Sequence, residues 1–149
     1  NKSYIRIPQN ISFNSFSNND SHVWEATHDG YRKKFRKIIK RKLTILESKF
    51  MIIGEDSIIS LHSREKNILY NIRFHLSTNC NASLSNNKKS VLIKTKLNNS
   101  FIFKSSDKLS IEESIVVKNE KNIERTSQIV ISGHTHYLKK NINWSLEKF

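Results

Sequence analysis

Apolar residues recur at every second position over much of the chain, which places successive side chains on opposite faces of an extended strand. Residues 68–76 are the clearest example, because their even-numbered positions are all apolar while most of the others are polar. Residues 91–97 alternate in the same way and are followed by two asparagines and a second alternating stretch at 101–103, a pattern typical of a β-hairpin. Further strands are expected at residues 4–7, 23–27, 43–46, 50–53, 114–117, 126–132 and 142–146.

The turns between these strands must form almost without glycine and proline, since the chain has only three Gly and one Pro. Asn, Ser and Asp can replace them, because their side chains hydrogen-bond to nearby backbone and tolerate left-handed conformations. We therefore expect turns at residues 14–21, 77–87 and 98–100, and at the charged segment 118–124. About ten short strands separated by such turns predict an all-β fold, an antiparallel β-sandwich.

A chain of 149 residues is long enough for one hydrophobic core and too short to expect two. The sequence therefore predicts a single β-sandwich domain over residues 1–149, with Trp24, Phe74, Phe101 and Trp144 in its core. The single cysteine, Cys80, excludes an internal disulfide and a zinc site built from cysteines. No apolar run approaches the roughly 20 residues that a membrane-spanning helix needs.

Residues 31–42 fit the strand pattern poorly. Tyr31, Phe35, Ile38 and Ile39 fall at helical spacing, and the segment carries eight basic residues. A basic amphipathic helix is one interpretation. The helix is disfavoured, because strand alternation resumes at Leu43 and the element would be short.

The formal net charge of +13 and the pI of about 10.0 predict long-range attraction to a polyanion or an anionic surface. The densest basic run follows His28-Asp29-Gly30-Tyr31, which combines a proton-transfer group, a carboxylate, a turn-forming glycine and a phenol. The structural alternative has Asp29 binding backbone amides, Gly30 at positive φ and Tyr31 packed as a core anchor. On the functional alternative, the candidate ligand contacts are His28, Asp29, Tyr31, Arg32, Lys33 and Arg36.

Two other groups of residues are weaker candidates. His134 and His136 would share one face of a strand, but a metal would need a third ligand from elsewhere, so an exposed polar hairpin is favoured. Gly54-Glu55-Asp56 is interpreted as a solvated turn, because adjacent carboxylates on a strand would point to opposite faces. No catalytic residue and no metal ligand can be assigned from these patterns.

Seven short stretches occur in an order that resembles the C-terminal region of heparinase II/III-like proteins. The resemblance runs from about residue 23 to residue 149. Its motifs are residues 25–31 (EATHDGY), 41–43 (RKL), 54–57 (GEDS), 72–76 (IRFHL), 109–114 (LSIEES), 126–133 (TSQIVISG) and 143–144 (NW).

This resemblance implies that the chain is the C-terminal part of a larger polysaccharide lyase-like protein, with an N-terminal α/α toroid as its partner domain. Such enzymes cleave uronate-containing glycans by β-elimination. The family's catalytic Tyr and His or Asn and its metal-binding motifs precede the stretch matched here, so the resemblance implies no cofactor in this chain and leaves room for a structural divalent metal in the parent protein. It also implies a bacterial cell envelope or periplasmic location.

Three functions therefore compete. The first is the β-sandwich of a lyase for acidic polysaccharide, inactive as an isolated fragment. The second is a basic module that binds nucleic acid or an anionic surface, which the excess of Lys over Arg and the lack of base-stacking motifs disfavour. The third is a purely structural sandwich that supports the toroid.

Overall fold

The computed structural model describes residues 7–62, 67–119, 122–135 and 138–149. These residues form two antiparallel sheets, one of eight strands in the order β1-β2-β3-β4-β11-β8-β7-β6 and one of three in the order β5-β10-β9. The strands of the large sheet are β1 (Ile11–Ser17), β2 (Ser21–His28), β3 (Lys37–Leu46), β4 (Met51–Ser60), β6 (Cys80–Leu84), β7 (Ser90–Thr95), β8 (Ser100–Ser105) and β11 (Lys139–Lys148). Those of the small sheet are β5 (Leu69–His75), β9 (Lys108–Asn119) and β10 (Asn122–His134).

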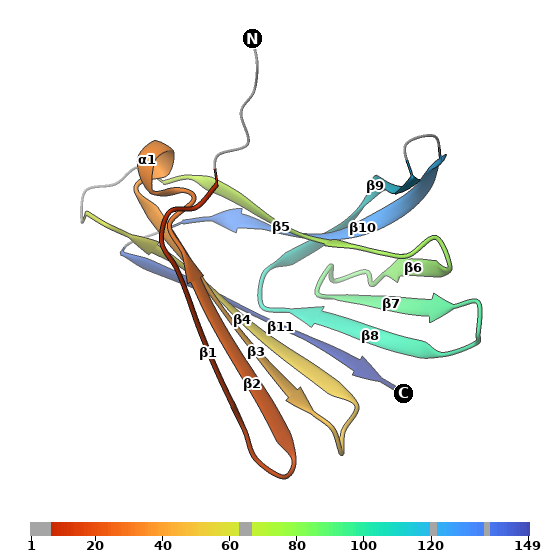
Figure 1. Ribbon diagram of the computed structural model, residues 1–149. Coiled ribbons are helices and arrows are strands. Elements are labelled where there is room, and N and C mark those ends of the chain that lie inside the picture. The colour runs from red at the N-terminus through yellow and green to blue at the C-terminus, as the bar shows by residue number, and fades with distance from the viewer. Residues whose placement is uncertain (1–6, 63–66, 120–121, 136–137) are drawn as a thin grey trace.

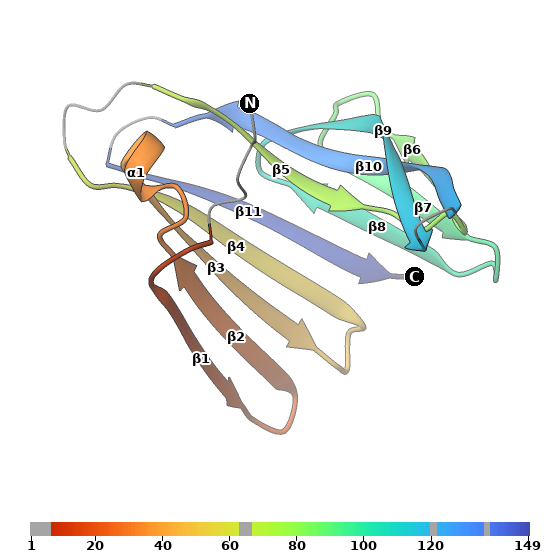
Figure 2. The ribbon, with the colours of Figure 1, turned by 45° about the horizontal axis from the view of Figure 1, so that its top comes forward.

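The all-β sandwich predicted from the alternation is confirmed. The only helix in the described part is a single turn, α1 (Arg32–Phe35), between β2 and β3. Figures 1 and 2 show the small sheet lying across the half of the large sheet that contains β6, β7, β8 and β11. The face of the large sheet that is turned toward the small sheet is called here the inner face. Its strands β1 and β2 extend beyond the small sheet and have no layer over them among the described residues, while β3 lies at the margin, with Ile39 and Leu43 packed against the core.

The hydrophobic core fills the space between the two sheets where they overlap. Val91 and Phe103 of the large sheet and Ile129 and Ile131 of the small sheet are almost completely buried there. The rings of Phe74, Phe103 and Trp144 contact one another, with centroids 4.7 to 5.6 Å apart. Burial of this apolar surface is the main source of stability, at roughly 25 cal/mol per Å² removed from water.

Two sequence predictions hold in detail. In β5, Tyr70, Ile72 and Phe74 pack against the core, while the residues between them are exposed. The strands β7 and β8 form the expected hairpin, in which Asn98 takes a left-handed conformation with φ of 60°.

Other predictions hold only in part or are wrong. Turns form within the expected segments 14–21 and 77–87, but these segments also contain the end of β1 and the whole of β6, because both strands lie at sheet edges where Asn and Ser can face water. Trp24 belongs to the large sheet but is 39% exposed, because it lies on the uncovered part of the inner face. The strand expected at 4–7 lies outside the described residues except for Ile7.

The segment 31–42 is divided between two elements. The helix α1 ends after four residues because Arg36 adopts φ of 51°, and its backbone N–H donates to the Arg32 carbonyl. From Lys37 onward the chain is the strand β3, which begins six residues before the alternation at Leu43. A long amphipathic helix is therefore not formed, and the strand predicted at residues 43–46 is confirmed but begins earlier than expected.

Candidate functional site

Asp29 directly follows β2, and its carboxylate forms hydrogen bonds with the segment that precedes β1. Its Oδ1 atom accepts hydrogen bonds from the backbone N–H groups of Gln9 (2.9 Å) and Asn10 (3.1 Å), and its Oδ2 accepts one from the Asn10 side-chain amide (2.6 Å). The hydrogen bonds from Asn10 hold the pKa of the Asp29 carboxyl below its usual range. This arrangement agrees with the structural interpretation of Asp29.

The other parts of that structural interpretation are wrong. No glycine in the described chain has a positive φ, so Gly30 is not required for a left-handed turn. The Tyr31 side chain is about half exposed and lies over the turn instead of in the core. Its ring centroid is 5.8 Å from that of His28 and 6.1 Å from that of Phe35, so the three rings form a partly exposed aromatic cluster.

His28 belongs to this aromatic cluster and also bonds to the turn that follows β2. Its Nδ1 atom accepts a hydrogen bond from the Gly30 N–H (3.3 Å), which places the proton of the neutral ring on Nε2. A shallow hollow of about 340 Å³ opens beside it, and its lining includes Thr27, Asp29 and Arg32. His28 and Arg32 can therefore both reach a ligand in that hollow.

The eight basic residues that follow Tyr31 have different surroundings. Lys33 is exposed, and Arg36 lies 2.9 Å from the Nε2 atom of His62. Lys37 and Arg41 lie on the inner face of β3, where Lys37 donates to the Ser60 hydroxyl. Only the side chains in the helical turn and on the other face of β3 are available to a ligand at the outer surface.

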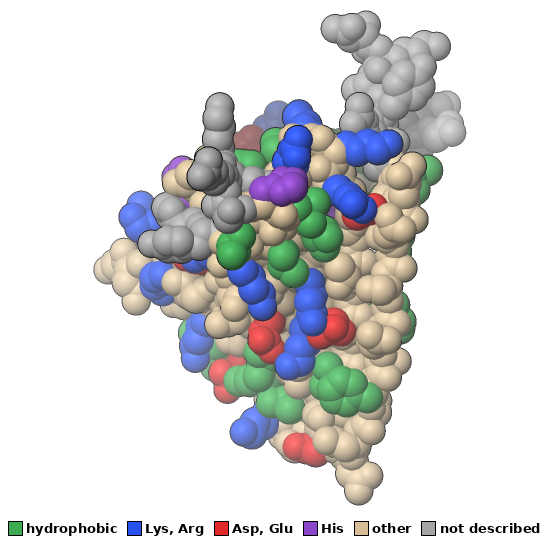
Figure 3. Space-filling view, turned by 90° about the vertical axis from the view of Figure 1, so that its left-hand side faces the viewer, with side chains coloured by type: hydrophobic (Ala, Val, Ile, Leu, Met, Phe, Trp, Pro, Cys, Tyr) green, Lys and Arg blue, Asp and Glu red, His purple; other side chains and the backbone are tan. Residues whose placement is uncertain are grey.

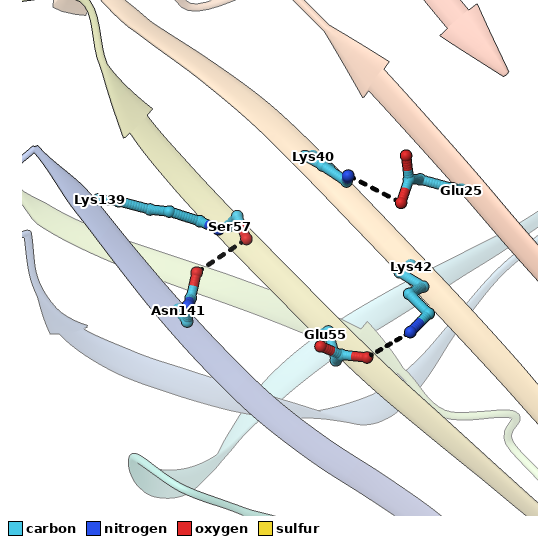
Figure 4. A pocket seen from close by; sticks show the side chains of 7 residues that line it. All are labelled: Glu25, Lys40, Lys42, Glu55, Ser57, Lys139 and Asn141. Carbon is cyan, nitrogen blue, oxygen red and sulfur yellow. Dashed lines mark hydrogen bonds and ion pairs between the residues drawn. The ribbon is translucent and has the colours of Figure 1, made fainter. Parts of the chain in front are cut away.

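That other face of the large sheet, called here the outer face, carries a second hollow of about 250 Å³ across β2, β3, β4 and β11 (Figure 4). Two lysines there have carboxylate partners: Lys40 pairs with Glu25 at 2.7 Å and Lys42 with Glu55 at 3.0 Å. Figure 3 shows basic and acidic side chains side by side on the flank of the molecule. The hollow is completed by Ser57, Lys139 and Asn141.

Lys139 differs from the other two lysines of this hollow. The Ser57 hydroxyl donates to the Asn141 side-chain oxygen (2.9 Å), which leaves the amide N–H₂ of Asn141 as a donor beside Lys139. Within the described chain no carboxylate lies within ion-pair distance of Lys139. An ammonium, an amide and a hydroxyl next to one another make a surface that suits an anion with hydroxyl groups.

Gly54-Glu55-Asp56 is part of β4, so its interpretation as a turn is wrong. Glu55 and Asp56 do point to opposite faces, and Asp56 is 3% exposed on the inner one. Arg41 binds Asp56 through two hydrogen bonds of 2.6 and 2.9 Å, and the Trp144 indole N–H donates to the same carboxylate at 2.9 Å. This network compensates the buried charge and joins β3, β4 and β11.

A further polar cluster, not anticipated from sequence, joins the two sheets at the loop between β8 and β9. The Tyr70 hydroxyl donates to Asp107 at 2.9 Å, and Lys140 forms an ion pair with the same carboxylate at 3.0 Å. Burial, followed by the hydrogen bond to Asp107, raises the pKa of Tyr70 far above its usual range. Tyr70 therefore stays protonated at neutral pH and is unsuited to act as a general base.

The described residues hold no group of three or more His, Cys, Asp or Glu side chains that could bind a metal ion. His134 is exposed at the end of β10, and His136 lies outside the described residues. No helix in this part of the chain is long and apolar enough to cross a membrane.

Comparison with known proteins identifies the family of this chain. The sequence profile of the family described as heparinase II/III-like, C-terminal, matches residues 5–145. The chain belongs to this family, and the enzymes with which the family is associated are polysaccharide lyases. No curated protein sequence matches the chain.

Solved structures show the same fold. Heparan sulfate lyase HepC from Pedobacter heparinus is similar with a TM-score of 0.77 and 14% identity, over 93% of this chain and 22% of that protein. A crystal structure of heparinase III is similar with a TM-score of 0.75 and 12% identity, over 93% of this chain and 21% of that one. The chain thus spans about a fifth of the length of these proteins.

Proposed function

We propose that the chain is the C-terminal β-sandwich of a polysaccharide lyase that cleaves acidic, uronate-containing glycans by β-elimination. The family match over residues 5–145 carries this proposal. The net charge of +13 supports it, because a basic surface attracts a polyanionic substrate. The location that fits this function is the bacterial cell envelope or periplasm.

The reaction sets requirements that this chain meets only in part. A base removes the proton next to the uronate carboxylate, a double bond forms as the bond to the leaving oxygen breaks, and an acid supplies a proton to that oxygen. A positive group must also offset the charge that develops on the carboxylate. The raised pKa of Tyr70 makes it unsuited as the base, so we assign the proton transfers, and any structural divalent metal, to an N-terminal toroid and the rest of the parent protein.

The contribution of this chain is to hold the substrate on the outer face. The two hollows lie next to each other there, since Thr27 of the first and Lys40 of the second are cross-strand partners. Exposed Lys33, next to Arg32 of the first hollow, and exposed Lys139, which lines the second, supply positive charge along this surface. The half-exposed Tyr31 ring adds a surface on which a sugar can stack, while His28, which shares the inner-face row of Ile11, reaches this surface only through the lining of the first hollow.

The proposal is tested by incubating the parent protein and this chain separately with heparan sulfate and with polygalacturonate. The unsaturated uronate that β-elimination forms absorbs in the near ultraviolet. We expect the parent protein to generate this absorbance and the chain alone to generate none. Product from the isolated chain, or none from the parent protein on any uronate glycan, would contradict the proposal.

The binding surface is tested with the double variant Lys33→Glu/Lys139→Glu. We expect its affinity for heparan sulfate to fall on the order of tenfold, because two unpaired cations reverse sign where the glycan lies. The matched control is Lys94→Glu/Lys96→Glu, which makes the same charge change at exposed positions in and after β7. An equal loss of affinity in both double variants would mean that only the net charge matters for binding. Salt-dependent binding to DNA that is stronger than binding to glycan would favour the nucleic-acid module instead.

A further inference from the structure

One end of the large sheet exposes apolar side chains next to lysines. The β3–β4 turn, the last residues of β11 and the β7–β8 turn lie side by side there, at the end of the sheet away from α1 (Figures 1 and 2). Backbone hydrogen bonds connect them, since the Lys148 N–H donates to the Phe50 carbonyl and the Phe149 N–H to the Ser100 carbonyl. This surface, called here the turn end, consists of Phe50, Lys94, Lys96, Leu97, Lys148 and Phe149.

The apolar side chains of the turn end project into solvent. Leu97 is 85% exposed, Phe50 is 73% exposed and Phe149 is 70% exposed. Phe50 also has a φ of 46°, a left-handed conformation that is uncommon for a large side chain and that concentrates at functional sites. The Lys148 Nζ atom lies 5.9 Å from the centroid of its ring. The three apolar side chains lie outside the core and offer surface that an external partner can bury.

The same end carries positive charge. Residues 77–106, which include the whole β7–β8 hairpin, contain five lysines and no acidic residue. Lys94 and Lys96 are exposed, and neither forms an ion pair with any residue that the structure describes. The acidic residues of the adjoining β3–β4 turn and of β11, Glu47 and Glu147, each lie within ion-pair distance of a His or Lys side chain. Unpaired lysines therefore surround the exposed apolar side chains.

We propose that the turn end binds the surface of an anionic phospholipid bilayer, with Phe50, Leu97 and Phe149 inserted among the headgroups. Apolar side chains within a ring of cations match such a surface, because apolar groups reach the acyl chains while lysines remain at the level of the lipid phosphates. An acidic glycan fits the turn end less well, since it would pair with the lysines and leave the apolar side chains in water. This contact goes beyond glycan binding and would hold the parent protein at a membrane.

Vesicle co-sedimentation tests the proposal with the 149-residue chain and with the parent protein. We expect both to bind mixed vesicles of phosphatidylcholine and phosphatidylglycerol, and to bind pure phosphatidylcholine vesicles at least about tenfold more weakly. The double variant Phe50→Ser/Leu97→Ser should bind mixed vesicles at least about tenfold more weakly than the wild type, because it removes inserted apolar surface. The matched control is Ile11→Ser/Leu69→Ser, which replaces side chains that are 68% and 59% exposed at the opposite end of each sheet and should bind like the wild type.

The charge of the turn end provides a second pair of variants. Lys94→Glu/Lys96→Glu, the control for glycan binding above, should lose about tenfold or more in affinity for mixed vesicles, because each lysine adds to the attraction of anionic lipid. Lys33→Glu/Lys139→Glu should keep its vesicle affinity, since these residues lie in α1 and at the start of β11, away from the turn end. The two double variants should thus have opposite effects on vesicle binding and glycan binding.

Several results would overturn the proposal. Equal affinity of the wild type for the two kinds of vesicle would do so without any variant, and so would equal vesicle binding by the two serine double variants. A parent protein that does not bind vesicles would show that other residues cover the turn end. A fall in heparan sulfate affinity in Phe50→Ser/Leu97→Ser would show that the turn end belongs to the glycan site instead. None of these readouts requires lyase activity, so the proposal can fail while the proposed function stands.

Discussion

The two halves of the large sheet are built alike but have different surroundings. Trp24 and Trp144 lie in one cross-strand row of the inner face, connected through Leu43 and Gly54. Trp144 lies beneath the small sheet and is 8% exposed, whereas Trp24 lies beyond it and is 39% exposed. The alternation of the sequence thus determines the face of the sheet on which a side chain lies, whereas the position of the small sheet determines whether that face is buried.

The largest expected effect separates these two tryptophans. Trp144→Ala should lower the free energy of unfolding by about 3–5 kcal/mol, because it opens a cavity between Phe74 and Phe103 and removes a hydrogen bond from buried Asp56. Trp24→Ala should change it by less than about 1 kcal/mol in the 149-residue chain. Urea unfolding followed by circular dichroism measures both, and similar losses would contradict the distinction between a covered and an open half.

A smaller effect is expected at Gly54, which lies directly opposite Trp144. A Cβ atom at this position would come within 2.0 Å of the indole ring, so Gly54→Ala should cost about 2–3 kcal/mol of stability. The control is Gly30→Ala, where the nearest atom is the His28 Nδ1 at 3.2 Å and the turn is not in the core. An unchanged urea midpoint in Gly54→Ala would show that the indole does not rest on this glycine.

The smallest effect is expected in the open half, at Asp29. Because hydrogen bonds lower its folded pKa below the usual 3.8, its contribution to stability is complete above the unfolded value and is lost as the pH falls through the folded one. The backbone amide resonances of Gln9 and Asn10 should therefore shift with a midpoint below 3.8 in an NMR titration. Asp29→Asn should abolish the shift, and a midpoint above 3.8 would contradict the hydrogen bonds described.

Much of the fold could be predicted because it depends on local pattern. The alternation in β5 and the two asparagines of the β7–β8 turn each determine their own conformation. The failures involve partners distant in sequence. The local sequence Gly54-Glu55-Asp56 is typical of a turn. It forms a strand because Trp144 packs over the glycine and Arg41 neutralises the aspartate, and neither partner is near in sequence.

The candidate site was predictable to a lesser degree. The motif from His28 to Arg36 could be recognised by its chemistry, and it stays a prediction as a ligand site. The use of Asp29 to bind Asn10 could not be seen in the sequence, because the partner lies 19 residues away, in the segment just before β1. No sequence motif marks Lys139 as a site residue. The pairing of β11 with β4 places it on the outer face beside Ser57.

The difference between the two halves is tested most directly by residue-resolved hydrogen exchange on the 149-residue chain. We expect the amides of β1 and of its ladder to β2 to exchange on the order of 100-fold faster than those of β8 and β11, because no second layer covers them and their local opening exposes little additional apolar surface. Equal protection of the two halves would contradict the account, since it would require the strands without a cover to be as stable as those beneath the small sheet.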